Sequence, residues 1–275
     1  MTEKDFEYAT MYGNAIITKY VGAGGAVIVP DTLGGCPVTR IKDLAFWGCT
    51  SLTSVTIPSS GIYIGSRTFR DCTGLTSITL PDGITHIESL LFQGCIRLSG
   101  ITLPNSVTTI EAFAFIDCIS LTSITLPNSV TDIRRGAFAD CTGLTSVTLP
   151  GSNVIIGEQA FSGCTGLTSI TLPDGITYIE DSMFAYCQGL TSITLPDGVT
   201  SIEEGAFKYC TGLTSVRLPN SVTAIGRRAF YDCTGLTSIN RPTSLTTIGI
   251  SAFEGCTSLI DIPLPNSVAS IGISY

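Results

Sequence analysis

The chain has 275 residues, of which 13% are charged and 44% are hydrophobic, so it lacks the low hydrophobicity and high net charge of a disordered polypeptide. Its net charge of −8 argues against binding to nucleic acid or to an anionic membrane surface, because both attract basic proteins. No apolar run approaches the ~20 residues of a membrane-spanning helix, and residues 1–5 lack the apolar core of a signal peptide. We therefore expect no membrane insertion.

The N-terminal residues differ from everything that follows. A β-rich run over residues 12–20 and a second one over 26–29 are separated by a glycine-rich segment. We predict that residues 1–21 form a hairpin that caps the first coil of a repeat domain over residues 22–275. An insertion of about five residues interrupts the first repeat and contains Cys36, the cysteine that we expect to be reactive.

The remaining cysteines reveal the organisation of the rest of the chain. From Cys49 to Cys256 every interval between cysteines is 23 residues, and Phe and Pro recur with the same period. A fixed period of this length is typical of a solenoid. The cysteines of the column are Cys49, Cys72, Cys95, Cys118, Cys141, Cys164, Cys187, Cys210, Cys233 and Cys256.

The coil that begins at Leu75 illustrates one repeat. Ile78 and Leu80 alternate with polar residues, which predicts a strand with one buried face. Pro81 cannot donate a ladder hydrogen bond and ends that strand, and Leu91–Phe92 reads as one tight helical turn. Stacking such coils would bury Leu, Ile, Phe and Cys in continuous columns.

The repeat resembles that of BspA-like leucine-rich repeat proteins. Residues 121–143, LTSITLPNSVTDIRRGAFADCTG, match nearly every position of the pattern L-x-x-I-x-L-P…I…A-F-x-x-C, and the resemblance covers about residues 22–275. We predict an α/β-type solenoid that is mostly β, a right-handed leucine-rich-repeat coil of about eleven turns. One parallel sheet would form its concave side and short turns or 3-10 segments its convex side. No C-terminal cap is visible before Tyr275, which predicts a longer native chain or self-association through that end.

The cysteine column invites a metal or redox interpretation. Metal sites need cysteines or histidines that converge on one point, whereas the closest two cysteines, Cys36 and Cys49, are 13 residues apart. Inward-pointing, parallel Cβ vectors disfavour disulfides between successive coils. We expect free thiols that act as small hydrophobes, which requires a reducing or anaerobic setting, and we expect no metal and no cofactor.

Catalytic residues are not apparent either. His86 is the only histidine and occupies a surface position held by unrelated residues in other coils. The acidic pairs Glu180-Asp181 and Glu203-Glu204 share their rim with arginine pairs, which is typical of a solvated charged edge. We expect no enzymatic activity.

The outward side of the predicted sheet is a regular array of serine and threonine. It is either a soluble surface without a ligand or a docking platform, as in many repeat proteins. Arg217, Asn240 and Arg241 interrupt the array. Arg241 replaces a leucine of other coils, and we predict a local bulge at Pro242 that turns it outward because an unpaired buried arginine is costly. The hypothetical ligand-binding residues are Arg217, Asn240, Arg241, Thr148, Thr171, Thr194, Ser192 and Ser215.

The other edge of the coils varies strongly from repeat to repeat, as in Arg135-Gly136, Asp181-Ser182 and Lys208-Tyr209. The sequence predicts non-enzymatic binding of a protein or glycan on the concave sheet. The resemblance implies a secreted or cell-surface bacterial protein that acts in adhesion to host or neighbouring cells. The alternatives are a cytoplasmic interaction scaffold and one section of a larger surface protein.

Overall fold

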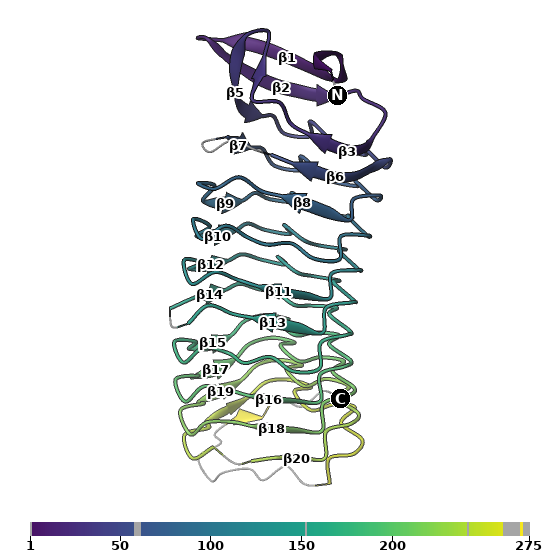
Figure 1. Ribbon diagram of the computed structural model, residues 1–275. Helices are drawn as coiled ribbons and strands as arrows, with labels where there is room; N and C mark the ends of the chain where they lie inside the picture. The colour runs from purple at the N-terminus through teal and green to yellow at the C-terminus, as the bar shows by residue number, and fades with distance from the viewer. Residues whose placement is uncertain (1, 58–61, 152, 241, 261–269, 272–275) are drawn as a thin grey trace.

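The chain winds into a stack of short coils that starts from a hairpin at the N-terminal end (Figure 1). The computed structural model describes residues 2–57, 62–151, 153–240, 242–260 and 270–271. Within these ranges the structure is strands and turns, and the one helical segment is a 3-10 turn, η1 (Glu3–Asp5). The predicted solenoid of mostly β structure is confirmed.

The N-terminal strands β1 (Phe6–Met11) and β2 (Asn14–Tyr20) pair antiparallel, and β2 pairs parallel with β5 (Cys36–Ile41). The insertion in the first repeat forms a second small hairpin. Its strand β4 (Thr32–Leu33) pairs antiparallel with β5 around Gly34–Gly35, where both residues adopt positive φ. Glycine suits this turn because it has no Cβ to oppose the left-handed conformation.

Most coils contribute a strand to a first row of parallel strands, which in most of them carries the predicted Ser-Ile-Thr pattern or a close variant of it. The central Ile or Val points inward and is buried, while the flanking residues are exposed in most coils, as the alternation predicts. The first row consists of β3 (Gly25–Ile28), β6 (Leu52–Thr56), β8 (Ser77–Thr79), β11 (Ser123–Thr125), β13 (Ser146–Thr148), β16 (Ser192–Thr194), β18 (Ser215–Arg217) and β20 (Ser238–Ile239).

The first row is divided into three ladders, β3-β6-β8, β11-β13 and β16-β18-β20. The first gap coincides with Gly100, which takes the place of serine; glycine weakens a strand because it loses more backbone entropy than other residues. At the second gap only a bridge between Thr171 and Thr194 remains, although Ser169-Ile170-Thr171 repeats the usual pattern. The expected single sheet is therefore interrupted.

The sequence did not predict a second row, made of two-residue strands that run alongside the first (Figure 1). Through β21, the second residue of each strand is a buried isoleucine. Two residues are too few to show the alternation that identifies a strand in a sequence. The second row consists of β7 (Tyr63–Ile64), β9 (His86–Ile87), β10 (Thr109–Ile110), β12 (Asp132–Ile133), β14 (Ile155–Ile156), β15 (Tyr178–Ile179), β17 (Ser201–Ile202), β19 (Ala224–Ile225), β21 (Thr247–Ile248) and β22 (Ser270–Ile271).

The segment expected to be a helical turn consists of hydrogen-bonded turns. The Leu91 N–H donates to the Glu88 carbonyl at 3.1 Å, but Leu90 between them has a φ of 59°. A residue with positive φ cannot continue a right-handed helix. Residues at the equivalent position of most other coils also have positive φ, so the turn is a regular part of the repeat.

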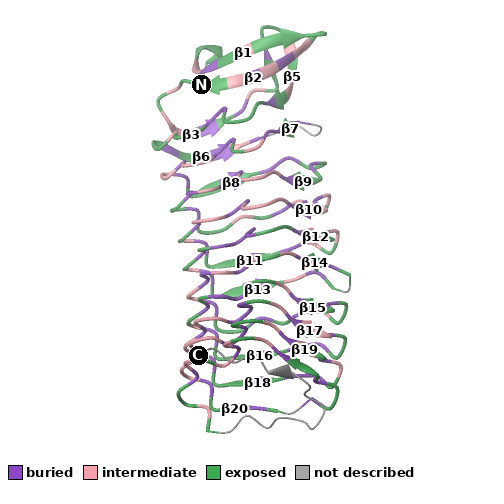
Figure 2. Ribbon diagram, turned by 180° about the vertical axis from the view of Figure 1, so that it is seen from behind, coloured by how far each residue is buried: buried purple, intermediate pink, exposed green. Residues whose placement is uncertain are grey.

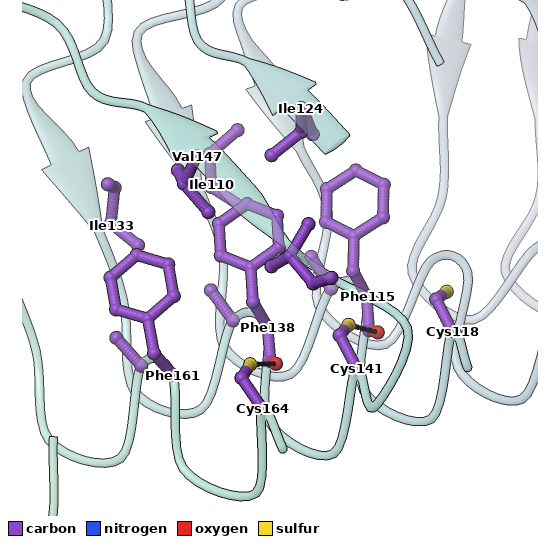
Figure 3. Close-up of a cluster of buried hydrophobic side chains, with 14 of the residues drawn as sticks. Ile110, Phe115, Cys118, Ile124, Ile133, Phe138, Cys141, Val147, Phe161 and Cys164 are labelled. Atoms are coloured by element: carbon purple, nitrogen blue, oxygen red, sulfur yellow. Dashed lines mark hydrogen bonds between the residues drawn. The ribbon is translucent and has the colours of Figure 1, made fainter. Parts of the chain in front are cut away.

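The interior is a continuous column of phenylalanine rings and cysteine thiols (Figure 3). From Phe46 to Phe253, neighbouring ring centroids lie 5.1 to 5.8 Å apart. Most of the rings are stacked, an arrangement that adds to the hydrophobic gain. Buried residues line the inside of the coils from end to end of the repeats (Figure 2).

The thiols link successive coils. Each buried thiol donates a hydrogen bond to the carbonyl of the phenylalanine 26 residues earlier, for example from Cys164 Sγ to Phe138 O at 3.2 Å. Burial raises the pKa of the Cys72 and Cys210 thiols to about 12, so both stay protonated and able to donate at neutral pH. All eleven cysteines are free in this structure.

Candidate functional site

Two surfaces of the solenoid carry polar side chains in a regular arrangement. The first, called the hydroxyl face below, consists of the outward serines and threonines of the first row. These side chains are exposed, and none makes a hydrogen bond with another described residue. The hydroxyl face comprises Ser77, Thr79, Thr102, Ser123, Thr125, Ser146, Thr148, Ser169, Thr171, Ser192, Thr194, Ser215 and Ser238.

A neighbouring threonine column shows what hydroxyls do when they serve the fold. Thr145 Oγ1 donates to the Thr122 carbonyl of the preceding coil at 3.0 Å, and Thr214 Oγ1 donates to the Thr191 carbonyl at 3.1 Å. The hydroxyl face makes no such bonds, so its donors and acceptors are available to water or to a ligand.

The structure brings most of the predicted binding residues together on this face. Ser192 and Thr194 of β16 pair with Ser215 and Arg217 of β18, and Thr171 bridges to Thr194. Thr148 is exposed on β13 of the same row. Arg241 and the bulge predicted for it lie outside the described residues.

Arg217 and Asn240 line a common hollow of about 300 Å³, together with Asp197 and Asn220. The Arg217 and Asn240 side chains differ in their hydrogen bonding. The Asn240 side-chain amide donates to the Leu218 carbonyl at 2.7 Å and accepts from the Leu218 N–H at 2.6 Å. It therefore links two neighbouring coils by hydrogen bonds. The Arg217 side chain is exposed and makes no ion pair or hydrogen bond with any described residue, which leaves its guanidinium available. A second hollow of about 860 Å³ lies over Gly100.

The second surface is a cleft of about 460 Å³ along the turns that connect the second row to the cysteines. We call it the tyrosine groove. The lining residues Gln159, Ser182 and Gly205 are called the floor, Glu158, Asp181 and Glu204 the acidic wall, and Tyr186, Tyr209 and Tyr231 with Lys208 the aromatic wall; Arg135 and Arg228 complete the lining.

Successive coils build the aromatic wall. The rings of Tyr186 and Tyr209 stack with centroids 4.8 Å apart and planes 14° apart, and Tyr231 meets Tyr209 edge to face at 5.6 Å. Lys208 Nζ lies 5.4 Å from the centroid of Tyr186, and the Arg228 guanidinium lies 5.6 Å from that of Tyr231. These cation–π contacts hold the rings in place before any ligand arrives.

Ion pairs and a backbone hydrogen bond orient the acidic wall. Glu158 lies 3.8 Å from Arg135, and Glu204 lies 3.9 Å from Arg227. Asp181 Oδ1 accepts a hydrogen bond from the Glu204 N–H at 2.9 Å. Such exposed pairs contribute little to stability, but they fix the direction of the carboxylates.

The floor residues share one backbone conformation. Gln159, Ser182 and Gly205 occupy the repeated turn position with positive φ, and a Cβ at Gly205 would lie only 3.1 Å from the Lys208 side chain and 3.2 Å from Ser182 Oγ. The sequence analysis noted that this edge varies but did not assemble a site from it. The signal was present, because Tyr186 and Tyr209 occupy the same repeat position in successive coils.

The remaining sequence candidates lie elsewhere. His86 on β9 places Nδ1 2.9 Å from Thr85 Oγ1 and borders a hollow of about 210 Å³. Cys36 is half-buried in the inserted hairpin. Burial and the neighbouring Glu203 raise the pKa of Glu180, beside the acidic wall. Among the described residues, no group of three or more His, Cys, Asp or Glu could hold a metal ion.

Comparison with known proteins gives a consistent picture. The chain matches the family described as BspA type leucine rich repeat region over residues 39–168, 131–240 and 177–275. No curated protein matches it significantly. In the part of the chain that the structure describes, no helix is long and apolar enough to cross a membrane.

Solved bacterial structures are similar over nearly the whole chain. A leucine rich repeat protein of T. pallidum is 26% identical, with a TM-score of 0.53 over 98% of this chain and 99% of that one. A leucine-rich repeat protein of Bacteroides ovatus is also 26% identical, with a TM-score of 0.55 over 93% and 92%. One from Eubacterium ventriosum shares the fold at 21% identity, with a TM-score of 0.55 over 91% and 92%.

Proposed function

We propose that this chain, which belongs to the BspA-type leucine-rich repeat family, binds a protein partner through its hydroxyl face and does so without catalysing a reaction. Leucine-rich repeat solenoids are protein-interaction folds, because stacked coils offer a long surface with a fixed backbone. The observation that carries the proposal is the exposed Arg217 guanidinium, which has no partner among the described residues, within an array of exposed hydroxyls.

The chemistry of the face suits a polypeptide with a carboxylate. Each hydroxyl both donates and accepts, so the array can pair with the N–H and C=O groups of a partner backbone. The Arg217 guanidinium can form a bidentate, charge-assisted pair with an Asp or Glu side chain. Arg217 shares its hollow with Asp197 and with Asn220, whose side-chain amide can hydrogen-bond to the same partner.

We further propose that binding takes place at the bacterial cell surface, in adhesion to host or neighbouring cells. BspA-like proteins are typically surface-associated, and the exposed serines and threonines of the hydroxyl face offer uncharged hydrogen-bonding groups to a large partner.

The experiment screens the labelled protein against an array of host and bacterial surface proteins, and compares the affinity of wild type and Arg217→Ala for each protein that binds. We expect roughly tenfold weaker binding for the variant, the loss typical of a central arginine anchor. Arg97→Ala is the matched control, since Arg97 is an exposed arginine outside the hydroxyl face and its loss should change nothing. Equal binding by wild type and Arg217→Ala would show that the site assignment is wrong.

A further inference from the structure

We propose that the tyrosine groove is a second binding site, and that it takes a neutral oligosaccharide. The groove is separate from the hydroxyl face in residues and chemistry, and the proposal does not depend on the partner of that face.

The first argument is the balance of charge in the groove. Its lining contains three carboxylates, on Glu158, Asp181 and Glu204, and three cations, on Arg135, Lys208 and Arg228. A phosphorylated, sulfated or strongly basic ligand would meet repulsion from one of the two sets. A neutral ligand with many hydroxyls avoids this, because a hydroxyl donates to a carboxylate and accepts from a cation.

The second argument is the aromatic wall. A sugar ring has an apolar face of C–H groups and a rim of hydroxyls, so it needs an aromatic surface next to polar groups. Tyr186 is 42% exposed and belongs to a wall whose rings are already fixed by stacking and by Lys208. Tyrosine provides a rigid amphipathic contact at a low cost in conformational entropy.

The third argument is size and shape. A volume of about 460 Å³ lies within the range of small-molecule sites. The floor residues Gln159, Ser182 and Gly205 come from three successive coils, which advance by ~4.8 Å each, so the groove is roughly 10 to 15 Å long. That length accommodates a few linked sugar rings that run along the solenoid axis.

The test is a panel of four neutral trisaccharides, maltotriose, cellotriose, triacetylchitotriose and mannotriose, titrated against the full chain by saturation-transfer NMR, alongside an array of neutral glycans. We expect saturable binding of at least one neutral glycan. Tyr209→Ala should weaken it about tenfold, whereas Tyr209→Phe, which retains the ring, should keep most of the affinity. Unfolding temperatures of the variants would establish that they remain folded.

Two controls keep the sites apart. Tyr178→Ala removes an exposed tyrosine of the second row that does not line the groove, and Arg217→Ala removes the anchor of the hydroxyl face; both should leave glycan binding unchanged. The proposal is overturned if no neutral glycan binds, if Tyr209→Ala binds as well as wild type, or if only a lysine-rich peptide binds and salt abolishes its binding.

Discussion

The hydroxyl face and the tyrosine groove are carried by the same coils but use them in opposite ways. On the hydroxyl face nearly every coil repeats Ser and Thr, whereas the groove occupies repeat positions whose residues vary along the solenoid and match only over a few coils. The same backbone and the same phenylalanine and cysteine column support both surfaces. The hydroxyl face therefore provides a long, uniform surface, whereas the tyrosine groove provides a single cleft formed by a few coils.

The comparison shows which positions are free to change. Inward residues are held by packing. The buried thiols, and the threonines such as Thr145 in the column beside the hydroxyl face, are held by hydrogen bonds to the preceding coil. The side chain of a turn residue such as Tyr209 is neither part of the inward core nor hydrogen-bonded to a neighbouring coil. A ligand site can therefore arise there by substitution without disturbing the stack.

The largest effect that we expect arises from the column that both surfaces share. The ordinary pKa of the thiol is 9.0, and burial raises that of Cys72 and Cys210 to about 12. A raised folded-state pKa gives stability that is complete below pH 9 and is lost as the pH rises from 9 through 12, because unfolded thiols then ionise first. Each thiol contributes a loss of about 1.4 kcal/mol per pH unit in that window.

Chemical denaturation at pH 8 and pH 10 under reducing conditions measures this loss. With many raised thiols in the column, the free energy of unfolding should fall by several kcal/mol, and both surfaces should unfold together. Cys141→Ala, which removes one deeply buried thiol, should show a smaller fall per pH unit than wild type. An unchanged denaturation midpoint at the two pH values would mean that the thiols do not act as described.

The second prediction concerns one ring of the same column. Phe138 is fully buried and stacks between Phe115 and Phe161 at 5.2 and 5.6 Å. Phe138→Ala should lower the free energy of unfolding by about 4 kcal/mol, since it leaves a cavity between two coils. Thermal and denaturant unfolding followed by circular dichroism would measure it against Tyr178→Ala, which removes an exposed ring. A loss below ~1 kcal/mol would contradict a tightly packed column.

The smallest predicted effect tests the two kinds of threonine within one coil. Thr145→Val removes a hydrogen bond to the Thr122 carbonyl and should cost about 0.5 to 1 kcal/mol. Thr148→Val removes an exposed hydroxyl of the hydroxyl face that has no partner among the described residues, and it should change stability by less than ~0.5 kcal/mol. Denaturation midpoints of the two variants would separate them, and equal losses would remove the distinction between structural and available hydroxyls.

The sequence revealed the features that repeat. The 23-residue spacing of Cys and Phe identified the solenoid, and the alternation around Ile78 identified the first row with its outward hydroxyls. Short-range features could not be predicted. Strands such as β9 have only two residues, and the positive φ of Leu90 is not signalled by its residue type. The tyrosine groove escaped because its residues lie in several coils and converge only when those coils stack.

The hydrogen bonds between coils also determine how the protein unfolds under mechanical force. Backbone and thiol hydrogen bonds link each coil to its neighbours, as when Phe138 N–H donates forward to the Ala160 carbonyl at 2.9 Å. A pull on the two ends therefore loads these links in series, and we expect the coils to peel away one at a time. Each released coil of 23 residues would add roughly 75 Å of chain. Under flow or shear, such a protein would lengthen in steps and absorb work while the unpeeled coils keep their surfaces intact.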